Sequence, residues 1–172
     1  MMLADLSDLP FTGFVPFDDL PHADVPRGPG VYAVLRQSTT PPCFLPVSPA
    51  GRFKGKDPTV PVSSLEAQWV EDTDVVYLGK AGDRNGLRRR LDSYRRFGSG
   101  DPVGHWGGRY IWQLTDADRL AVAWHATMPG GAEDLEHHLI ATFKEHHGGR
   151  RPFANLKDGT APERLSPTDS GI

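Results

Sequence analysis

A glutamate stands on the apolar face of the helix predicted for residues 132–147. At 100° per residue, Glu136 falls inside the apolar stripe of that helix and not opposite it. The stripe consists of Ala132, Leu135, Leu139, Ile140 and Phe143. A carboxylate at such a position is costly unless it is paired or bound to a metal. Glu136 therefore indicates either an internal ion pair or a site for a cation.

An arginine occupies the corresponding position on a second predicted helix, residues 87–97. Its apolar stripe contains Leu87, Leu91 and Tyr94, and Arg90 lies between them. A half-buried guanidinium needs an anionic partner. Two interpretations follow from the pattern. Arg90 and Glu136 form an internal salt bridge, or they share a cleft that holds a divalent metal and a phosphate.

The elements that must position these side chains can be predicted from hydrophobic pattern. The apolar run Val75–Leu78, which ends at Gly79, predicts a buried strand, and residues 31–35 and 119–126 predict two more. A turn containing Gly79, Gly82 and Gly86 precedes the Arg90 helix. The Glu136 helix is expected to end at Gly148-Gly149. Residues 109–114 fit either a strand or a short helix.

Five elements in this order resemble the GIY-YIG nuclease family, in the branch found in the excision-repair nuclease UvrC. They are Gly30-Val31-Tyr32, the segment Tyr77-Leu78-Gly79-Lys80-Ala81, the helix segment from Leu87 to Tyr94, Glu136 and Asn155. The resemblance covers residues 28–157. It implies an α/β fold with a small, three-stranded, mostly antiparallel sheet flanked by helices, and it favours a helix for residues 109–114.

The resemblance also implies an activity, the metal-dependent endonucleolytic hydrolysis of DNA phosphodiester bonds. Glu136 would bind Mg²⁺ or Mn²⁺, since magnesium needs few carboxylates and keeps its waters. Arg90 would bind the non-bridging phosphate oxygens as charge develops. Tyr32 would act as general base or position the attacking water.

Four further roles follow from the same resemblance. Tyr77 and Tyr94 would orient phosphate and water, and Lys80 would add positive charge beside the tyrosines. Asn155 would brace the backbone of the active site. Seen alone, each of these residues has a simpler explanation, because strand tyrosines usually pack in the core and asparagines favour turns.

Charge is unevenly distributed along the 172 residues, whose net charge is -3. Residues 1–29 hold five Asp and one Arg, whereas residues 80–96 hold seven Lys or Arg and two Asp. Lys80, Arg88, Arg89, Arg95 and Arg96 are the predicted nucleic-acid-binding residues, with DNA as the partner. An arginine-rich helix face that serves only solubility is the alternative.

Domain organisation is predicted to be simple. Residues 1–27 form a Pro- and Asp-rich arm that packs in part on the domain, residues 28–158 form the nuclease-like domain, and residues 159–172 form a flexible tail. Residues 37–73 are an insert between the two motif strands, with a short helix at 63–70. The insert supplies substrate contacts or is a surface decoration without function.

The sequence excludes or disfavours several classes of protein and of binding site. Cys43 is the only cysteine, so neither an intrachain disulfide nor a cysteine zinc cluster can form. No signal peptide and no apolar run of transmembrane length is present, which predicts a cytoplasmic protein without a membrane partner. The competing function is a catalytically silent nucleic-acid-binding or protein-interaction module on the same fold. A homodimer, or a partner that supplies specificity, is a third interpretation.

Overall fold

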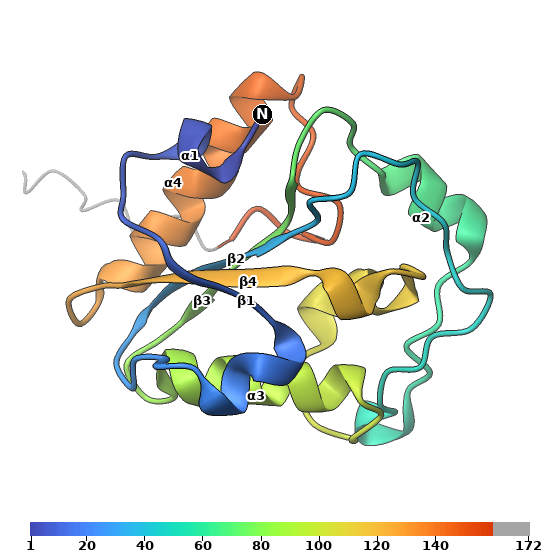
Figure 1. Ribbon diagram of the computed structural model, residues 1–172, viewed down its shortest axis with the longest axis horizontal. Coiled ribbons are helices and arrows are strands. Elements are labelled where there is room, and N and C mark those ends of the chain that lie inside the picture. The colour runs from blue at the N-terminus through green and yellow to red at the C-terminus, as the bar shows by residue number, and fades with distance from the viewer. Residues whose placement is uncertain (160–172) are drawn as a thin grey trace, which may run out of the picture.

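The computed structural model describes residues 1–159 and contains a four-stranded antiparallel sheet (Figure 1). The strands are β1 (Thr12–Pro16), β2 (Gly30–Leu35), β3 (Val75–Ala81) and β4 (Ala121–Ala126), in the order β1-β4-β2-β3. The α/β class and the three predicted strands are confirmed. The predicted tail lies outside the described residues from position 160 onward.

The expectation of three strands was wrong, because β1 comes from the N-terminal arm. This strand pairs with β4 through a bulge between Gly13 and Val15, and Phe14 has a positive φ of 57°. β1 is an edge strand, and most of its side chains are exposed. A short segment with Gly and Pro and no apolar alternation carries little strand signal, so its pairing is decided by the neighbouring strand.

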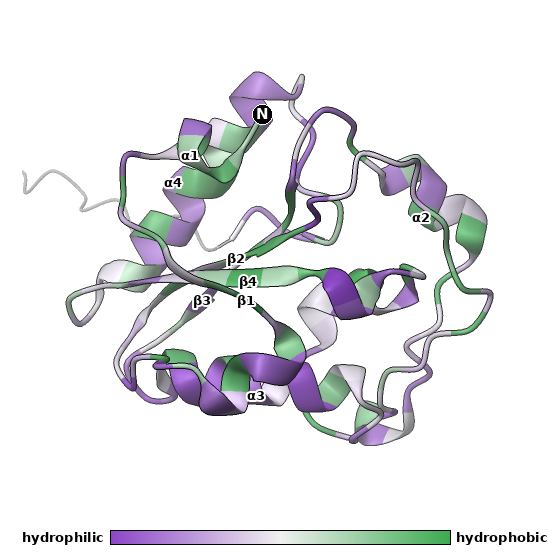
Figure 2. Ribbon diagram, viewed as in Figure 1, coloured by the Kyte–Doolittle hydropathy of each residue, from purple (hydrophilic) through white to green (hydrophobic). Residues whose placement is uncertain are grey.

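Helices cover both faces of the sheet (Figure 1). α4 (Gly131–His146) and the short α1 (Leu3–Leu6) lie on one face, and α3 (Gly86–Gly98) and the 3-10 helix η1 (Phe17–His22) lie on the other. Hydrophobic and hydrophilic residues are interleaved along α3 and α4, as expected for helices with one buried side (Figure 2). Both helices confirm the sequence prediction within two residues at each end.

The central strand β2 separates two hydrophobic clusters. All six of its residues are buried. Tyr32 and Val34 belong to the cluster on the α3 side, whereas Val31, Ala33 and Leu35 belong to the cluster on the α4 side. Because side chains alternate along a strand, the Tyr32 side chain points to the α3 face of the sheet.

The insert is packed onto the domain. It contains the 3-10 helix η2 (Phe53–Gly55) and α2 (Val62–Gln68), the short helix that the sequence predicted. The helix predicted for residues 109–114 is confirmed as part of the 3-10 helix η3 (Trp106–Gln113). Its last residue, Gln113, contacts the insert. The buried Gln113 amide accepts a hydrogen bond from the Val60 N–H at 2.7 Å and donates to the carbonyls of Leu45 and Val60, both at 3.0 Å.

The start of the insert is anchored by Arg36, which is buried. Its Nε lies 2.8 Å from a carboxylate oxygen of Asp116, which precedes the 3-10 helix η4 (Ala117–Arg119). The guanidinium also donates to the carbonyls of Ser38 and Thr40 and lies 5.4 Å from the Trp69 ring centre.

Within residues 1–159 no helix has the length and apolar character needed to cross a membrane.

Candidate active site

Three tyrosines from three elements form a cluster on the α3 face of the sheet. Tyr32 comes from β2, Tyr77 from β3 and Tyr94 from α3. Their ring centres lie 5.6 to 6.3 Å apart. Tyr32 is opposite Gly79 in the β2–β3 register, and a Cβ added to Gly79 would lie 2.5 Å from Tyr32 Cζ. The glycine after Leu78 therefore makes room for the Tyr32 ring.

Arg90 of α3 lies beside this cluster and is half-buried. Burial lowers the pKa of Arg90, but its nearness to the phenols of Tyr32 and Tyr77 outweighs this and raises the pKa overall. Among residues 1–159, no carboxylate oxygen lies within 4.0 Å of the Arg90 guanidinium. The internal Arg90–Glu136 salt bridge, one of the two interpretations of the pattern, is not formed.

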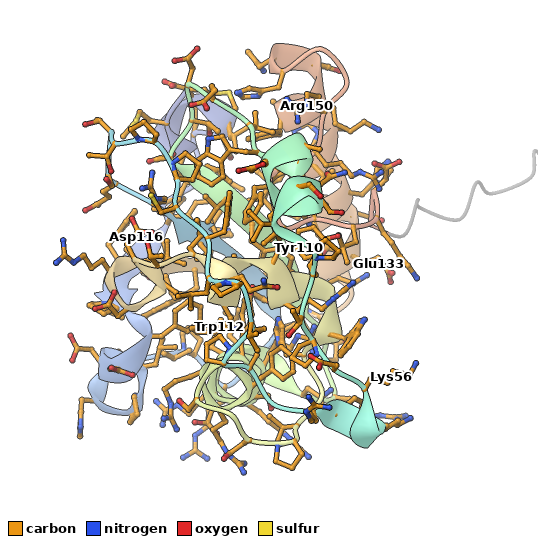
Figure 3. The ribbon with its side chains drawn as sticks, turned by 90° about the vertical axis from the view of Figure 1, so that its right-hand side faces the viewer. Lys56, Tyr110, Trp112, Asp116, Glu133 and Arg150 are labelled. Atoms are coloured by element: carbon orange, nitrogen blue, oxygen red, sulfur yellow. The ribbon has the colours of Figure 1, made fainter. Side chains whose placement is uncertain are left out.

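Glu136 of α4 is partnered by a lysine. Its side chain is 12% exposed, and Oε2 lies 3.7 Å from Nζ of Lys80 on β3. Lys80 also pairs with Glu133, which Figure 3 labels at the start of α4. Burial raises the pKa of Glu136, and the positive charges of Lys80 and Arg90 oppose this shift. Glu136 also acts electrostatically on Tyr32 and Tyr77, so it lies near the cluster.

Two of the three tyrosine hydroxyls have hydrogen-bond partners in the protein. The Tyr94 hydroxyl donates to the Gly108 carbonyl at 2.7 Å, and the Tyr32 oxygen lies 3.2 Å from Nε2 of His105. Tyr32 and Tyr94 have no exposed surface and Tyr77 is only 6% exposed. Burial raises the pKa of all three phenols. The three tyrosines are therefore shielded from solvent, whereas Lys80, Arg90 and Glu136 are partly exposed.

His105 is the residue of this site that sequence reasoning did not find. It is 1% exposed and stacks on the Tyr94 ring at 3.5 Å with an interplanar angle of 5°. Burial, with the charge of Arg90, lowers its pKa well below the ordinary value of 6.5. The only sequence signal was its place in the Gly-rich connector between α3 and η3, and nothing in its spacing relates it to Tyr32.

Asn155 braces the free edge of β3. Its side-chain oxygen accepts a hydrogen bond from the Leu78 N–H at 2.9 Å, and its amide nitrogen donates to the Leu78 carbonyl at 2.8 Å. The preceding Ala154 N–H donates to the Val76 carbonyl at 2.9 Å. Leu78 stands between Tyr77 and Lys80, so these contacts hold the backbone that carries both side chains. The resemblance implied a bracing role for Asn155 in an active site; the structure places its side chain on the β3 backbone, and the link to an active site stays a prediction.

The arginine-rich face of α3 is partly neutralised within the protein. Three of its four predicted DNA-binding arginines have carboxylate neighbours. These pairs are Arg88–Asp24 at 3.8 Å, Arg95–Asp92 at 2.8 Å and Arg96–Asp101 at 2.7 Å. Arg89 is exposed and forms no ion pair within residues 1–159. Beside it, a groove of about 490 Å³ between η1 and α3 is lined in part by Arg27, Arg88 and Arg89.

The donor set at Glu136 fits one class of metal ion. Within the described part of the chain, no three His, Cys, Asp or Glu side chains are grouped closely enough to enclose a metal. A zinc site of the tetrahedral, protein-enclosed kind does not fit this arrangement. One half-buried carboxylate beside an arginine fits a magnesium or manganese ion that keeps waters and takes a phosphate oxygen as a ligand.

Comparison with known proteins adds no assignment to this geometry. No family model, no curated protein and no solved structure matches the chain.

Proposed function

We propose that this protein is a metal-dependent endonuclease that hydrolyses DNA phosphodiester bonds at the site formed by Lys80, Arg90 and Glu136. The observation that carries the proposal is the half-buried Arg90 guanidinium, which has no carboxylate within 4.0 Å in residues 1–159. A buried cation without an internal counter-ion is stabilised by an external anion. A phosphate matches the fork of guanidinium N–H donors.

The residues of the proposed site have different roles, which depend on how exposed each side chain is. Arg90 donates to the non-bridging oxygens and stabilises the charge that builds up on them. Lys80 adds positive charge at the same edge of β3. Glu136 would hold Mg²⁺ or Mn²⁺, which supplies an activated water and further charge neutralisation when bound. Because burial raises the pKa of Tyr32, its phenol stays protonated near neutral pH, which favours a positioning role over that of general base.

The insert adds candidate contacts for a polyanion. Phe53 of η2 packs against Gly104, the residue before His105, with a Cβ added at Gly104 lying 3.3 Å from Phe53 Cζ. Lys54 and Lys56 flank this contact and are exposed. In Figure 3, Lys56 and Glu133 lie toward the same side of the molecule. We infer that DNA lies across this side, with its backbone near Lys54 and Lys56.

Cleavage of supercoiled plasmid with Mg²⁺ or Mn²⁺ tests the proposal. Wild type is expected to nick or linearise the plasmid, and Arg90→Ala and Glu136→Ala are expected to lose this activity, as is wild type in chelator. Arg119→Ala and Glu145→Ala remove the same charges at exposed positions away from the site and serve as matched controls. Cleavage that survives Arg90→Ala or Glu136→Ala in purified protein would refute the assigned site.

A catalytically silent binding module is the second candidate, and one observation favours it. The hydroxyls of Tyr32 and Tyr94 are buried and bonded within the protein. A wild type that binds DNA with steep salt dependence but cleaves no substrate with any divalent metal would establish this alternative. A protein-interaction module, in contrast, would bind DNA weakly at every salt concentration.

A further inference from the structure

His105 lies among the residues that the motif assigns to chemistry, yet it belongs to none of the motif segments. Its ring is stacked on Tyr94, and its Nε2 lies 3.2 Å from the Tyr32 oxygen. The ring centres of Tyr32 and Tyr77 both lie 6.3 Å from it. A histidine with 1% exposure in this position is part of the site and not a surface residue of the connector.

The direction of the Tyr32–His105 hydrogen bond follows from the groups around the Tyr32 oxygen. Within residues 1–159, the Nε2 of His105 is the hydrogen-bond partner that lies within 3.5 Å of this oxygen. The buried phenolic hydrogen of Tyr32 needs an acceptor, and the neutral His105 Nε2 supplies one. The lone pairs of the Tyr32 oxygen are then left for the cation Arg90, whose charge acts on this phenol. This arrangement requires the imidazole proton to be on Nδ1.

The unpartnered nitrogen of His105 is consistent with a selected orientation. Nδ1 is buried and has no hydrogen-bond partner in the described part of the chain. A buried polar atom without a partner is costly and calls for a compensating role elsewhere. Stacking on Tyr94 fixes the ring plane, and the 3.2 Å contact with the Tyr32 oxygen fixes which nitrogen faces Tyr32.

We propose that His105 is a positioning residue of this site, which accepts the Tyr32 hydroxyl hydrogen and so turns the Tyr32 oxygen toward Arg90. The oxygen then holds one edge of the guanidinium and leaves the remaining N–H groups to bind a phosphate diester. The proposal rests on the proposed nuclease function, which it deepens by adding a residue from outside the motif.

The groups that face His105 are consistent with a neutral imidazole. They are Tyr32 from β2, Tyr77 from β3, and Arg90 and Tyr94 from α3. None is a carboxylate, and the one cation among them disfavours a second positive charge. An imidazole that stays neutral keeps Nε2 available as an acceptor through the physiological pH range.

Long-range ¹H–¹⁵N spectra of histidine-labelled full-length protein test the hydrogen bond without any activity measurement. Between about pH 5 and pH 8, we expect a neutral His105 with its proton on Nδ1. The Nε2 resonance should move in Tyr32→Phe, which removes the donor. His105→Gln assigns the signals, because it removes the His105 resonances and leaves those of the other histidines. A proton on Nε2, or ordinary titration of His105, overturns the proposal.

Cleavage kinetics test the positioning role. His105→Gln supplies an amide oxygen as acceptor, and we expect kcat within about threefold of wild type. His105→Phe keeps the stack and removes the acceptor, and we expect kcat to fall about tenfold with little change in melting temperature. Because both residues act through one hydroxyl, the double variant His105→Phe/Tyr32→Phe should be no slower than Tyr32→Phe alone.

The outcomes separate this proposal from its alternatives. Additive losses in the double variant mean that His105 only packs, and a faster His105→Phe enzyme means that the connector blocks the site. Either result overturns the positioning role. If wild type cleaves no substrate, the proposed function fails, whereas the spectra still decide whether His105 accepts from Tyr32.

Discussion

Replacing Asn155 by alanine should destabilise the protein far more than its single side chain suggests. The side chain is buried, and it pairs with both backbone groups of Leu78, at 2.9 Å to the N–H and 2.8 Å to the carbonyl. Alanine can replace neither contact. Each buried group left without a partner costs about 1–3 kcal/mol, so we expect a loss of about 2–6 kcal/mol in the free energy of unfolding.

Thermal and urea denaturation measure this loss. For a domain of this size the expected fall in melting temperature is about 4–24 °C. Asn85→Ala changes the other asparagine of the chain, which is exposed and makes no side-chain cap bond, and should alter the unfolding free energy by less than about 0.5 kcal/mol.

A third variant tests which group donates and which accepts in the contacts between Asn155 and Leu78. Asn155→Asp keeps an acceptor for the Leu78 N–H but offers a second acceptor to the Leu78 carbonyl. Its deficit relative to wild type should shrink below about pH 4, where the carboxyl gains a donor hydrogen. If Asn155→Ala is no less stable than Asn85→Ala, Asn155 does not brace β3.

Three further predictions concern other parts of the fold. Gly79→Ala should cost about 1–3 kcal/mol, because its Cβ would lie 2.5 Å from Tyr32 Cζ, whereas Gly82→Ala meets nothing within 4 Å and should be neutral in the same melts. Gln113→Leu should cost about 2–4 kcal/mol and speed amide exchange in the insert, and unchanged exchange would contradict its anchoring role. Burial raises the pKa of Glu136 above its ordinary 4.5, so its contribution to stability is full below that value and is lost as pH rises through the folded-state pKa. Glu136→Gln should therefore gain stability relative to wild type as pH increases above 4.5 in urea titrations, and a constant difference would count against the raised pKa.

Much of the fold could be predicted because the pattern of apolar residues was strong. β2, β3 and β4 are runs of apolar residues bounded by glycine or polar turns, and α3 and α4 show helical periodicity over three turns or more. β1 was missed because a five-residue edge strand that contains Gly13 and Pro16 buries little of its own surface. The insert was correctly expected to contain a short helix, but its attachment through Gln113 has no sequence signal.

Some residues of the candidate site could likewise be found from the sequence, and others could not. Arg90 and Glu136 could be found from the sequence, since a charged residue on an apolar helical stripe conflicts with the cost of burying charge, wherever the helix packs. The resemblance to the GIY-YIG family likewise implied that Tyr32, Tyr77, Tyr94 and Asn155 would share one site.

Which of these residues pair is decided only by the tertiary structure. Glu136 meets Lys80 and not Arg90, and His105 comes from a connector with no periodicity to place beside Tyr32. A repeating pattern records which side of an element faces the core, and this is a local property of the sequence. Partners in an ion pair or a hydrogen bond depend on how separate elements pack to within a few ångströms, and that distance is not encoded in the spacing of residues along the chain.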